Sequence, residues 1–137
     1  MTIAHAFADA AERCVGRPFR LYGRTPESGF DCVGLLAWCC LQSGMRPVLP
    51  RTYALRNTRA SFVEPFLSKS GFAPVFERES ASDLIVVRTG PSQVHFMVAG
   101  CDGHFVHAHA GLRKVVRTDT LQWPVIARWC IASLNQE

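Results

Sequence analysis

Hydrophobic residues recur at helical spacing near the start of the chain and at alternate positions in its second half. The first apolar stripe, broken by charged residues, predicts an amphipathic helix over residues 3–15, which Gly16 and Pro18 end. Residues 16–29 are rich in glycine, proline and polar side chains, a composition typical of a loop with room for one extended piece. A second helix is predicted over 31–44, and because apolar residues cover nearly its whole circumference we expect it at the centre of the domain.

A weaker apolar stripe predicts a third helix over residues 61–69. Ser61 and Glu64 fit the capping box that starts many helices, although Pro65 follows directly. Helices followed by an antiparallel sheet of five or six strands predict an α+β fold. The strand period is found over 73–76, 83–88, 93–100, 104–110, 113–118 and 125–133.

The length and composition of the chain fit one globular domain spanning residues 1–137. The formal charge of +4 comes from scattered arginines and not from a basic run, so we expect no nucleic-acid partner. The longest apolar run, residues 33–41, is too short to span a membrane. The N-terminal residues lack the pattern of a secretory signal, so we expect synthesis in the cytoplasm without one.

The chain has six cysteines and no C-x-x-C pair, so the usual spacing of a structural zinc site is missing. Because a reducing place of synthesis disfavours disulfides, we expect most of these cysteines to be small buried hydrophobic residues. We expect no cofactor. The cysteines are Cys14, Cys32, Cys39, Cys40, Cys101 and Cys130.

One of them, Cys32, falls in the first turn of the second predicted helix. The partial positive charge at a helix N-terminus favours a thiolate over a thiol, which is how many nucleophilic cysteines are activated. Asp31 can cap the same helix, and Gly34 lets a substrate or another segment approach. The simpler interpretation is one more buried cysteine, but the polar loop before it can open a cleft. We therefore hypothesise that Cys32 is a nucleophile.

A thiolate nucleophile needs a general base, and four histidines fall in two adjacent predicted strands. Residues 101–103 between these strands suit a three-residue hairpin loop. That loop sets His95 opposite His109 and puts both on one sheet face with His107. A two-residue loop would move His107 to the opposite face. The imidazole that acts as base also needs a group to orient it, and either His107 or His109 could serve.

Four segments of the sequence resemble, in order and spacing, the NlpC-type cell-wall cysteine peptidases, and the D-C-x-G-L motif at 31–35 is the most specific of the shared features. The resemblance implies a reduced papain-like α+β domain. It implies hydrolysis of peptidoglycan stem peptides through a cysteine thioester, usually at the bond from the side-chain carboxyl of D-glutamate to a diamino acid. The matching segments are 16–38, 80–88, 93–100 and 104–116.

Carried over by position, the resemblance implies that Cys32 is the nucleophile, His95 the base and His107 the orienting residue. The sequence departs from the family near this site. Phe19 stands where the family usually has a tyrosine, so one hydroxyl is missing, and Tyr22 is a neighbouring residue that could supply it. Val33 stands where the family usually has serine.

The G-x-D-C-x-G-L form at 29–35 and the terminal W-P-V-I-A-R-W strand at 123–129 look most like the small family members encoded in the tail clusters of phages and gene-transfer particles. That resemblance implies action on the cell wall as part of a phage-like tail particle, with tail proteins as partners and peptidoglycan or muropeptides as substrate. Three alternatives stay open: a non-enzymatic tail component with a vestigial site, an acyltransferase that uses the same thioester, and a metal site. The metal ligands would be Cys32, His95, His107 and His109.

Overall fold

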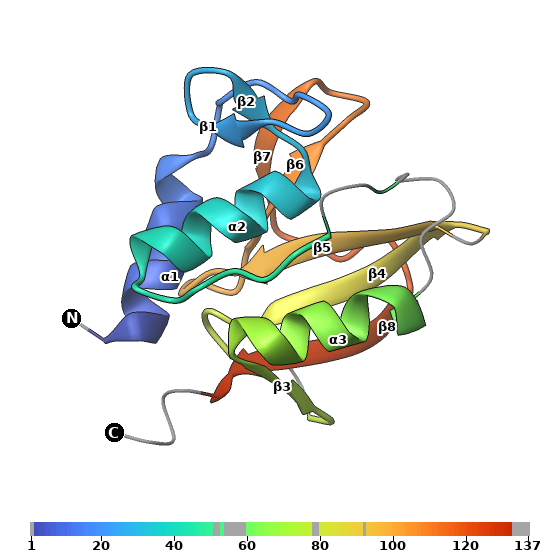
Figure 1. Cartoon of the computed structure of the whole chain (residues 1–137). Helices are drawn as coiled ribbons and strands as arrows, with labels where there is room; N and C mark the ends of the chain where they lie inside the picture. The colour runs from blue at the N-terminus through green and yellow to red at the C-terminus, as the bar shows by residue number, and fades with distance from the viewer. Residues whose placement is uncertain (1, 51–52, 54–59, 78–79, 92, 133–137) are drawn as a thin grey trace.

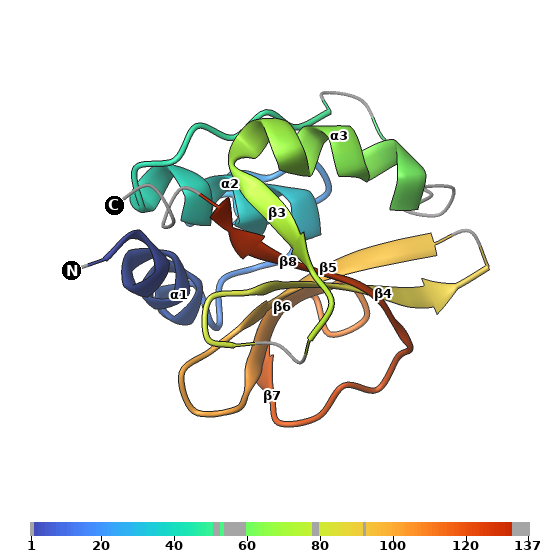
Figure 2. The same cartoon turned by 90° about the horizontal axis from the view of Figure 1, so that it is seen from below.

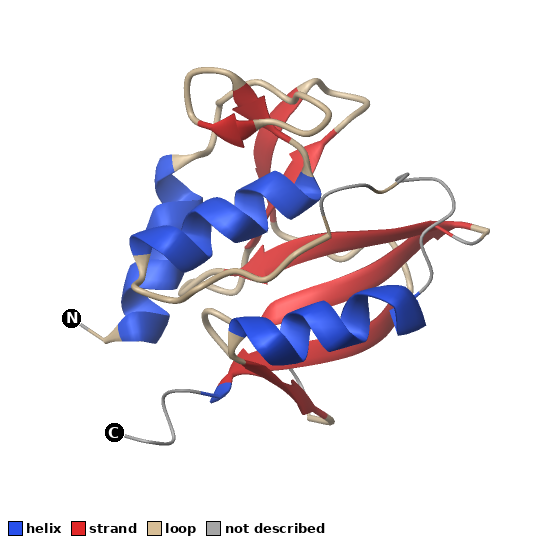
Figure 3. Cartoon of the chain, in the orientation of Figure 1, coloured by secondary structure: helices blue, strands red, loops and turns tan. Residues whose placement is uncertain are grey.

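The computed structural model describes residues 2–50, 53, 60–77, 80–91 and 93–132 of the chain. These residues form three helices, a six-stranded antiparallel sheet and a small two-stranded sheet (Figure 1, Figure 3). The helices are α1 (Ile3–Arg13), α2 (Cys32–Gln42) and α3 (Ala60–Ser70), and the small sheet pairs β1 (Arg24–Thr25) with β2 (Gly29–Phe30). The large sheet has the spatial order β3-β8-β4-β5-β6-β7 and contains β3 (Phe72–Val75), β4 (Leu84–Gly90), β5 (Gln93–Ala99), β6 (Phe105–His109), β7 (Lys114–Thr118) and β8 (Val125–Ile131).

The predicted α+β class is confirmed. Each predicted helix and strand overlaps an observed one, and their ends differ by two residues at most. Among the described elements, β1 and β2 are not predicted as a strand pair, because the sequence predicts a loop over 16–29 with room for only one extended piece. No helix in the described part of the chain is both long and apolar enough to cross a lipid bilayer.

The three helices cover one face of the large sheet, as Figure 2 shows from below. The main core lies between the helices and the sheet. It contains residues of all three helices together with alternate residues of the strands, such as Val94, Phe96 and Val98 of β5. The opposite face carries a smaller apolar cluster that includes Met97 and is covered by the chain between β7 and β8. The sheet therefore has two buried faces, and successive residues of β5 point into different clusters.

Helix α2 is the central helix of the domain, as predicted. Eight of its residues are buried, from Cys32 at its first position to Cys40 near its end. Asp31 caps it, because its carboxylate accepts a hydrogen bond from the N–H of Gly34 at 2.7 Å. Ser43 is the C-cap of the helix, and Gly44 after it has a φ of 89°, a left-handed conformation that favours glycine.

The loop before α2 is held along the free edge of β7. The N–H of Gly16 donates to the carbonyl of Val115 at 2.9 Å, and the N–H of Phe19 donates to the carbonyl of Arg113 at 2.9 Å. These bonds cover backbone groups that an edge strand would otherwise expose. The loop then reaches β2, where the N–H of Phe30 donates to the carbonyl of Pro18 at 2.9 Å. The start of α2 is therefore fixed relative to the sheet.

The hairpin between β5 and β6 has the predicted three-residue loop. Val98 pairs with Val106, Ala99 pairs with Phe105, and the N–H of Gly100 donates to the carbonyl of His104 at 2.8 Å. The sequence also predicts that His95 lies opposite His109, and this is wrong as a strand pair. Pairing between β5 and β6 ends at Val98 and Val106, although both strands continue, and Figure 1 shows the two strands diverging. His95 is instead paired on its other side with Val87 of β4.

Gly34 marks a close approach between α2 and the preceding loop. A β-carbon on this residue would lie 1.9 Å from the carbonyl oxygen of Gly23, which is a backbone atom that cannot rotate away. Helix propensity alone predicts that Gly34→Ala stabilises the protein by up to about 1 kcal/mol. We expect the opposite sign, a loss of about 1–3 kcal/mol, because the clash forces the loop and the helix apart.

Urea denaturation of Gly34→Ala tests this prediction. Leu41→Ala is the matched control, because Leu41 lies on the same helix and is 58% exposed, so its truncation should change stability by less than about 0.5 kcal/mol. A Gly34→Ala protein at least as stable as the wild type would contradict the close approach.

Candidate active site

The divergence of β5 and β6 opens a pocket beside the N-terminus of α2. The pocket has a volume of about 160 Å³. Cys32 reaches it from the helix side of the sheet, and His95 reaches it from β5. The lining residues most relevant to chemistry are Cys32, His95, His107 and His109, with Phe19 and Trp123 among the others. The structure thus brings the predicted nucleophile and all three predicted histidines to one pocket.

A hydrogen bond joins His95 to His107, with 2.8 Å between Nε2 of His95 and Nδ1 of His107. His107 is 1% exposed, so this bond lies in a largely buried setting. Because Nε2 of His95 is occupied, Nδ1 is the nitrogen of this ring that is left to exchange a proton with a thiol. His95 therefore has the arrangement of a base whose second nitrogen is held by another group.

His109 is near this pair but is bonded elsewhere. Its ring centre lies 5.5 Å from that of His107, and its Nδ1 accepts the N–H of Leu112 at 3.1 Å. The sequence left His107 and His109 open as the orienting group. In the structure, His107 is the one that is hydrogen-bonded to His95.

Cys32 is buried at the other side of the pocket, with 3% of its surface exposed. Among the interactions of the described residues, no hydrogen bond joins its sulfur to His95. The backbone of Phe96, the residue that follows His95 on β5, lowers the pKa of this thiol. Thiol and imidazole therefore face the same space without a direct bond between them.

The surroundings of Cys32 favour the neutral thiol at rest, although a helix N-terminus by itself favours a thiolate. The pKa of this thiol is raised from 9.0 to about 12, chiefly by burial and also by the negative charge of Asp31, although backbone groups at Phe96 and Val33 oppose the shift. A rise of this size corresponds to about 4 kcal/mol. The partial charge of a helix end stabilises a thiolate by only about 0.3–1 kcal/mol, so the effect of desolvation on the pKa is larger.

The histidine pair is neutral as well. Burial lowers the pKa of His95, and the neighbouring charges of His107 and His109 lower it further. Burial also lowers the pKa of His107, with His109 as the second cause. The resting site therefore holds a thiol and uncharged imidazoles near neutral pH, and not a thiolate with an imidazolium.

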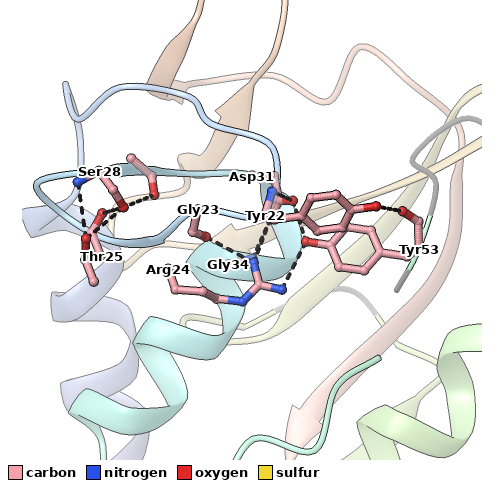
Figure 4. A network of polar contacts seen from close by, with 9 residues as sticks. Tyr22, Gly23, Arg24, Thr25, Ser28, Asp31, Gly34 and Tyr53 are labelled. Atoms are coloured by element: carbon pink, nitrogen blue, oxygen red, sulfur yellow. Dashed lines mark hydrogen bonds and ion pairs between the residues drawn. The ribbon is translucent and has the colours of Figure 1, made fainter. Parts of the chain in front are cut away.

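Asp31, directly before Cys32, joins several segments around the start of α2 (Figure 4). Its side chain is fully buried. One carboxylate oxygen accepts the N–H of Gly34 and lies 3.3 Å from Nη1 of Arg24. The other oxygen accepts the N–H of Tyr22 at 2.8 Å and the hydroxyl of Tyr53. These four donors offset the cost of burying the charge.

Tyr22 does not supply the missing hydroxyl, so this expectation is wrong. Its hydroxyl donates to the backbone carbonyl of Tyr53 at 2.5 Å, and Tyr22 does not line the Cys32 pocket. The reason is the turn at this residue, whose φ is 62° and whose N–H is held by Asp31. Phe19 does line the pocket, together with Cys32.

Sequence reasoning missed two residues near the site. Tyr53 lies outside every predicted element, yet its hydroxyl binds Asp31 and receives a hydrogen bond from Nη2 of Arg24 at 3.1 Å. Trp123 follows β7 and lines the pocket beside the histidines. The sequence carries no spacing or motif that could have joined either residue to Cys32, because both come from loops.

The alternative of a metal centre gains no support. Within the described ranges, no group of three or more histidine, cysteine, aspartate or glutamate side chains is placed to hold a metal ion.

Comparison with known proteins identifies the fold. No protein-family model matches the sequence, and no curated protein matches it. Solved structures do match. NlpC2 from Trichomonas vaginalis superposes with a TM-score of 0.70 at 18% sequence identity, over 93% of this chain and 48% of that protein, so this chain spans about half of its length.

Two matched structures are close to this chain in length. The NlpC/p60 domain of the peptidoglycan hydrolase SagA superposes with a TM-score of 0.62 at 22% identity, covering 91% of this chain and 96% of that one. RipD from Mycobacterium tuberculosis, a non-catalytic NlpC/p60 domain protein adapted to peptidoglycan binding, gives 0.64 at 17% identity, covering 95% and 97%. The chain therefore has the NlpC/p60 fold, as the resemblance implied.

The buried histidine pair should make stability depend on pH. Because the folded pKa values of both histidines lie below the ordinary 6.5, the unfolded chain binds more protons below that pH. Stability is therefore full above about pH 6.5 and falls as the pH drops. We expect the free energy of unfolding to decrease by roughly 1–3 kcal/mol from about pH 7.5 to about pH 5.5.

Denaturant titrations across this pH range measure the slope. The double variant His95→Gln/His107→Gln should have a shallower slope, whereas His5→Gln, which changes an exposed histidine of α1, should keep the wild-type slope. Equal slopes in all three proteins would contradict the neutral buried pair.

The raised pKa of Cys32 predicts slow alkylation in the resting protein. We expect its reaction with iodoacetamide near pH 7 to be slower than that of the exposed Cys101, and to be still increasing at about pH 10. Asp31→Asn removes the second cause of the shift and should move the rise to lower pH. Mass spectrometry of the separate cysteine peptides measures both rates, and a rate for Cys32 that is already constant at pH 7 would show a resting thiolate.

Proposed function

We propose that this protein is a cysteine peptidase that hydrolyses the stem peptides of peptidoglycan through a thioester on Cys32. The observation that carries the proposal is the 2.8 Å hydrogen bond between His95 and His107 in a pocket that Cys32 also lines. A partly buried imidazole with one nitrogen held and the other free beside a thiol has the parts of a nucleophile and base pair.

In the proposed mechanism the peptide carbonyl enters between Cys32 and His95. Nδ1 of His95 takes the thiol proton as sulfur attacks the carbonyl carbon, and the N–H of Cys32 donates to the oxyanion. The proton then passes from His95 to the leaving amine, the C–N bond breaks, and a thioester remains. A water molecule that gives its proton to His95 attacks the thioester, and the acid leaves as Cys32 regains a proton.

His107 acts through His95 in this scheme. Its Nδ1 accepts the Nε2–H of His95, which fixes the tautomer of the base and stabilises the imidazolium that forms during the reaction. A neutral resting pair requires that the proton moves only when a substrate is bound. The cost of forming the charged pair in the buried pocket is then offset by the developing oxyanion and its donors.

The substrate assignment is supported by the sequence resemblance and by the shared fold with SagA, a peptidoglycan hydrolase. Within a stem peptide we propose the bond from the side-chain carboxyl of D-glutamate to the diamino acid. Stem peptides carry free carboxylates, which suit the formal charge of +4 of this chain.

We further propose that the enzyme works on the cell wall as part of a phage-like tail particle. The support is the likeness of the D-C-x-G-L region and of the last strand to the small tail-encoded members of the family. Tail proteins would then hold the enzyme at its substrate.

A second candidate function is peptidoglycan binding without cleavage. The neutral thiol of Cys32 and the absence of a direct hydrogen bond from it to His95, both within the described residues, favour this alternative. RipD combines the same fold with such a role. Hydrolysis itself separates the two candidates.

Incubation with defined muropeptides and with purified peptidoglycan tests the proposal. We expect Cys32→Ala and His95→Ala to lower kcat/KM by at least about 1,000-fold, and His107→Ala by an amount on the order of 100-fold, because loss of an orienting group leaves nucleophile and base in place. Cys101→Ala is the control, since this cysteine lies exposed in the β5–β6 loop.

Mass spectrometry of the products assigns the reaction. Release of fragments with a new amine on the diamino acid supports the proposed bond, and products joined to an added amine would identify an acyltransferase. Equal product from wild type and Cys32→Ala would end the peptidase proposal, and binding without any product would favour the second candidate.

A further inference from the structure

Trp123 contacts all three histidines of the pocket. Its ring centre lies 5.9 Å from that of His95, 5.7 Å from that of His107 and 6.3 Å from that of His109. The contact with His107 has an interplanar angle of 90° and that with His95 one of 74°, so both are edge-to-face. A residue from the connection between β7 and β8 therefore packs on both partners of the His95–His107 hydrogen bond.

The position of Trp123 is fixed by the smaller apolar cluster. Together with Leu121 and Val125 it packs against buried residues on the sheet face away from the helices, Met97 among them. Because Met97 is two residues after His95 on β5, both side chains lie on that face. Trp123 thus extends the apolar cover of this face over the histidines.

The hydrogen bond needs such cover more at one end than at the other. His107 is 1% exposed, whereas His95 is only partly buried because it opens into the pocket. Water that reaches the His95–His107 hydrogen bond would compete for Nε2 of His95. It would also weaken the bond by raising the local dielectric, since a hydrogen bond is stronger in a low dielectric. The indole ring occupies space next to both rings and lines the same pocket.

We propose that Trp123 is a positioning residue that shields the His95–His107 hydrogen bond from water and holds the two rings in the geometry needed for proton transfer. The shielding is a property of the resting protein. Its effect on catalysis rests on the proposed function.

The first experiment measures the shielding without any substrate. In protein with ¹⁵N-labelled histidine, NMR follows the Nε2–H proton of His95 and its exchange with water. We expect Trp123→Ala to accelerate this exchange by at least about 10-fold, because the apolar cover is removed. Trp123→Phe keeps an aromatic ring and should stay within about 3-fold of the wild type.

Trp38→Ala is the matched control. Trp38 is a partly buried tryptophan of α2 that packs against Phe30, so its loss removes a similar ring at a different place. We expect it to lower stability without changing the exchange of the His95 proton. Unchanged exchange in a folded Trp123→Ala protein would overturn the proposal, and so would equal acceleration in both alanine variants. If Trp123→Ala does not fold, Trp123→Leu replaces it, and unchanged exchange there has the same meaning.

The second experiment applies once hydrolysis is established. A positioning role predicts that Trp123→Ala lowers kcat by about 10-fold or more with little change in KM, and that Trp123→Phe restores most of it. An equal loss in the phenylalanine variant, or a change in KM alone, would contradict it. Because the exchange measurement needs no turnover, an inactive wild-type protein would refute the proposed function and still leave the shielding to be decided by NMR.

Discussion

The structure depends on a buried carboxylate. Asp31 is fully removed from water, and it holds the start of α2, the turn at Tyr22, the guanidinium of Arg24 and the hydroxyl of Tyr53 through one side chain. A buried charge is tolerated only when donors surround it, so these segments must come together for the fold to be stable. The same convergence places Cys32, the next residue, at a defined point against the sheet. The negative charge has a chemical consequence too, because it helps to keep the neighbouring thiol protonated.

The second constraint is the incomplete pairing of β5 with β6. The two strands are joined close to their loop and separate before His95 and His109. If the pairing continued, the sheet would lie between Cys32 on the helix side and the histidines on the other side. The separation lets side chains from both sides line one pocket. A sheet that opens in this way loses backbone hydrogen bonds, and the aromatic contacts of Trp123 with the histidine rings add packing where the ladder is missing.

The resting electrostatics distinguish this site from one with a preformed thiolate and imidazolium. Desolvation disfavours both the thiolate of Cys32 and the imidazolium forms of the histidines. A charge on one histidine also lowers the pKa of its neighbour. In the proposed reaction, activation therefore has to come with the substrate, whose carbonyl would develop a negative charge beside the imidazole. Solved structures with this fold include both a domain of a peptidoglycan hydrolase and a non-catalytic protein adapted to peptidoglycan binding.

The sequence by itself determined the class of fold, the order of helices and strands, the position of Cys32 at the start of a buried helix, and the three-residue loop that puts His95 and His107 on the same side. These features follow from local periodicity, caps and turns, which neighbouring residues set. Only the tertiary structure decided that β5 and β6 diverge, that Tyr53 and Trp123 join the site, that Tyr22 does not, and that the thiol is neutral. Contacts between distant segments and the exclusion of water decide those features. Neither is encoded in the spacing of residues along the chain, because both depend on how completely the packed elements close around each side chain.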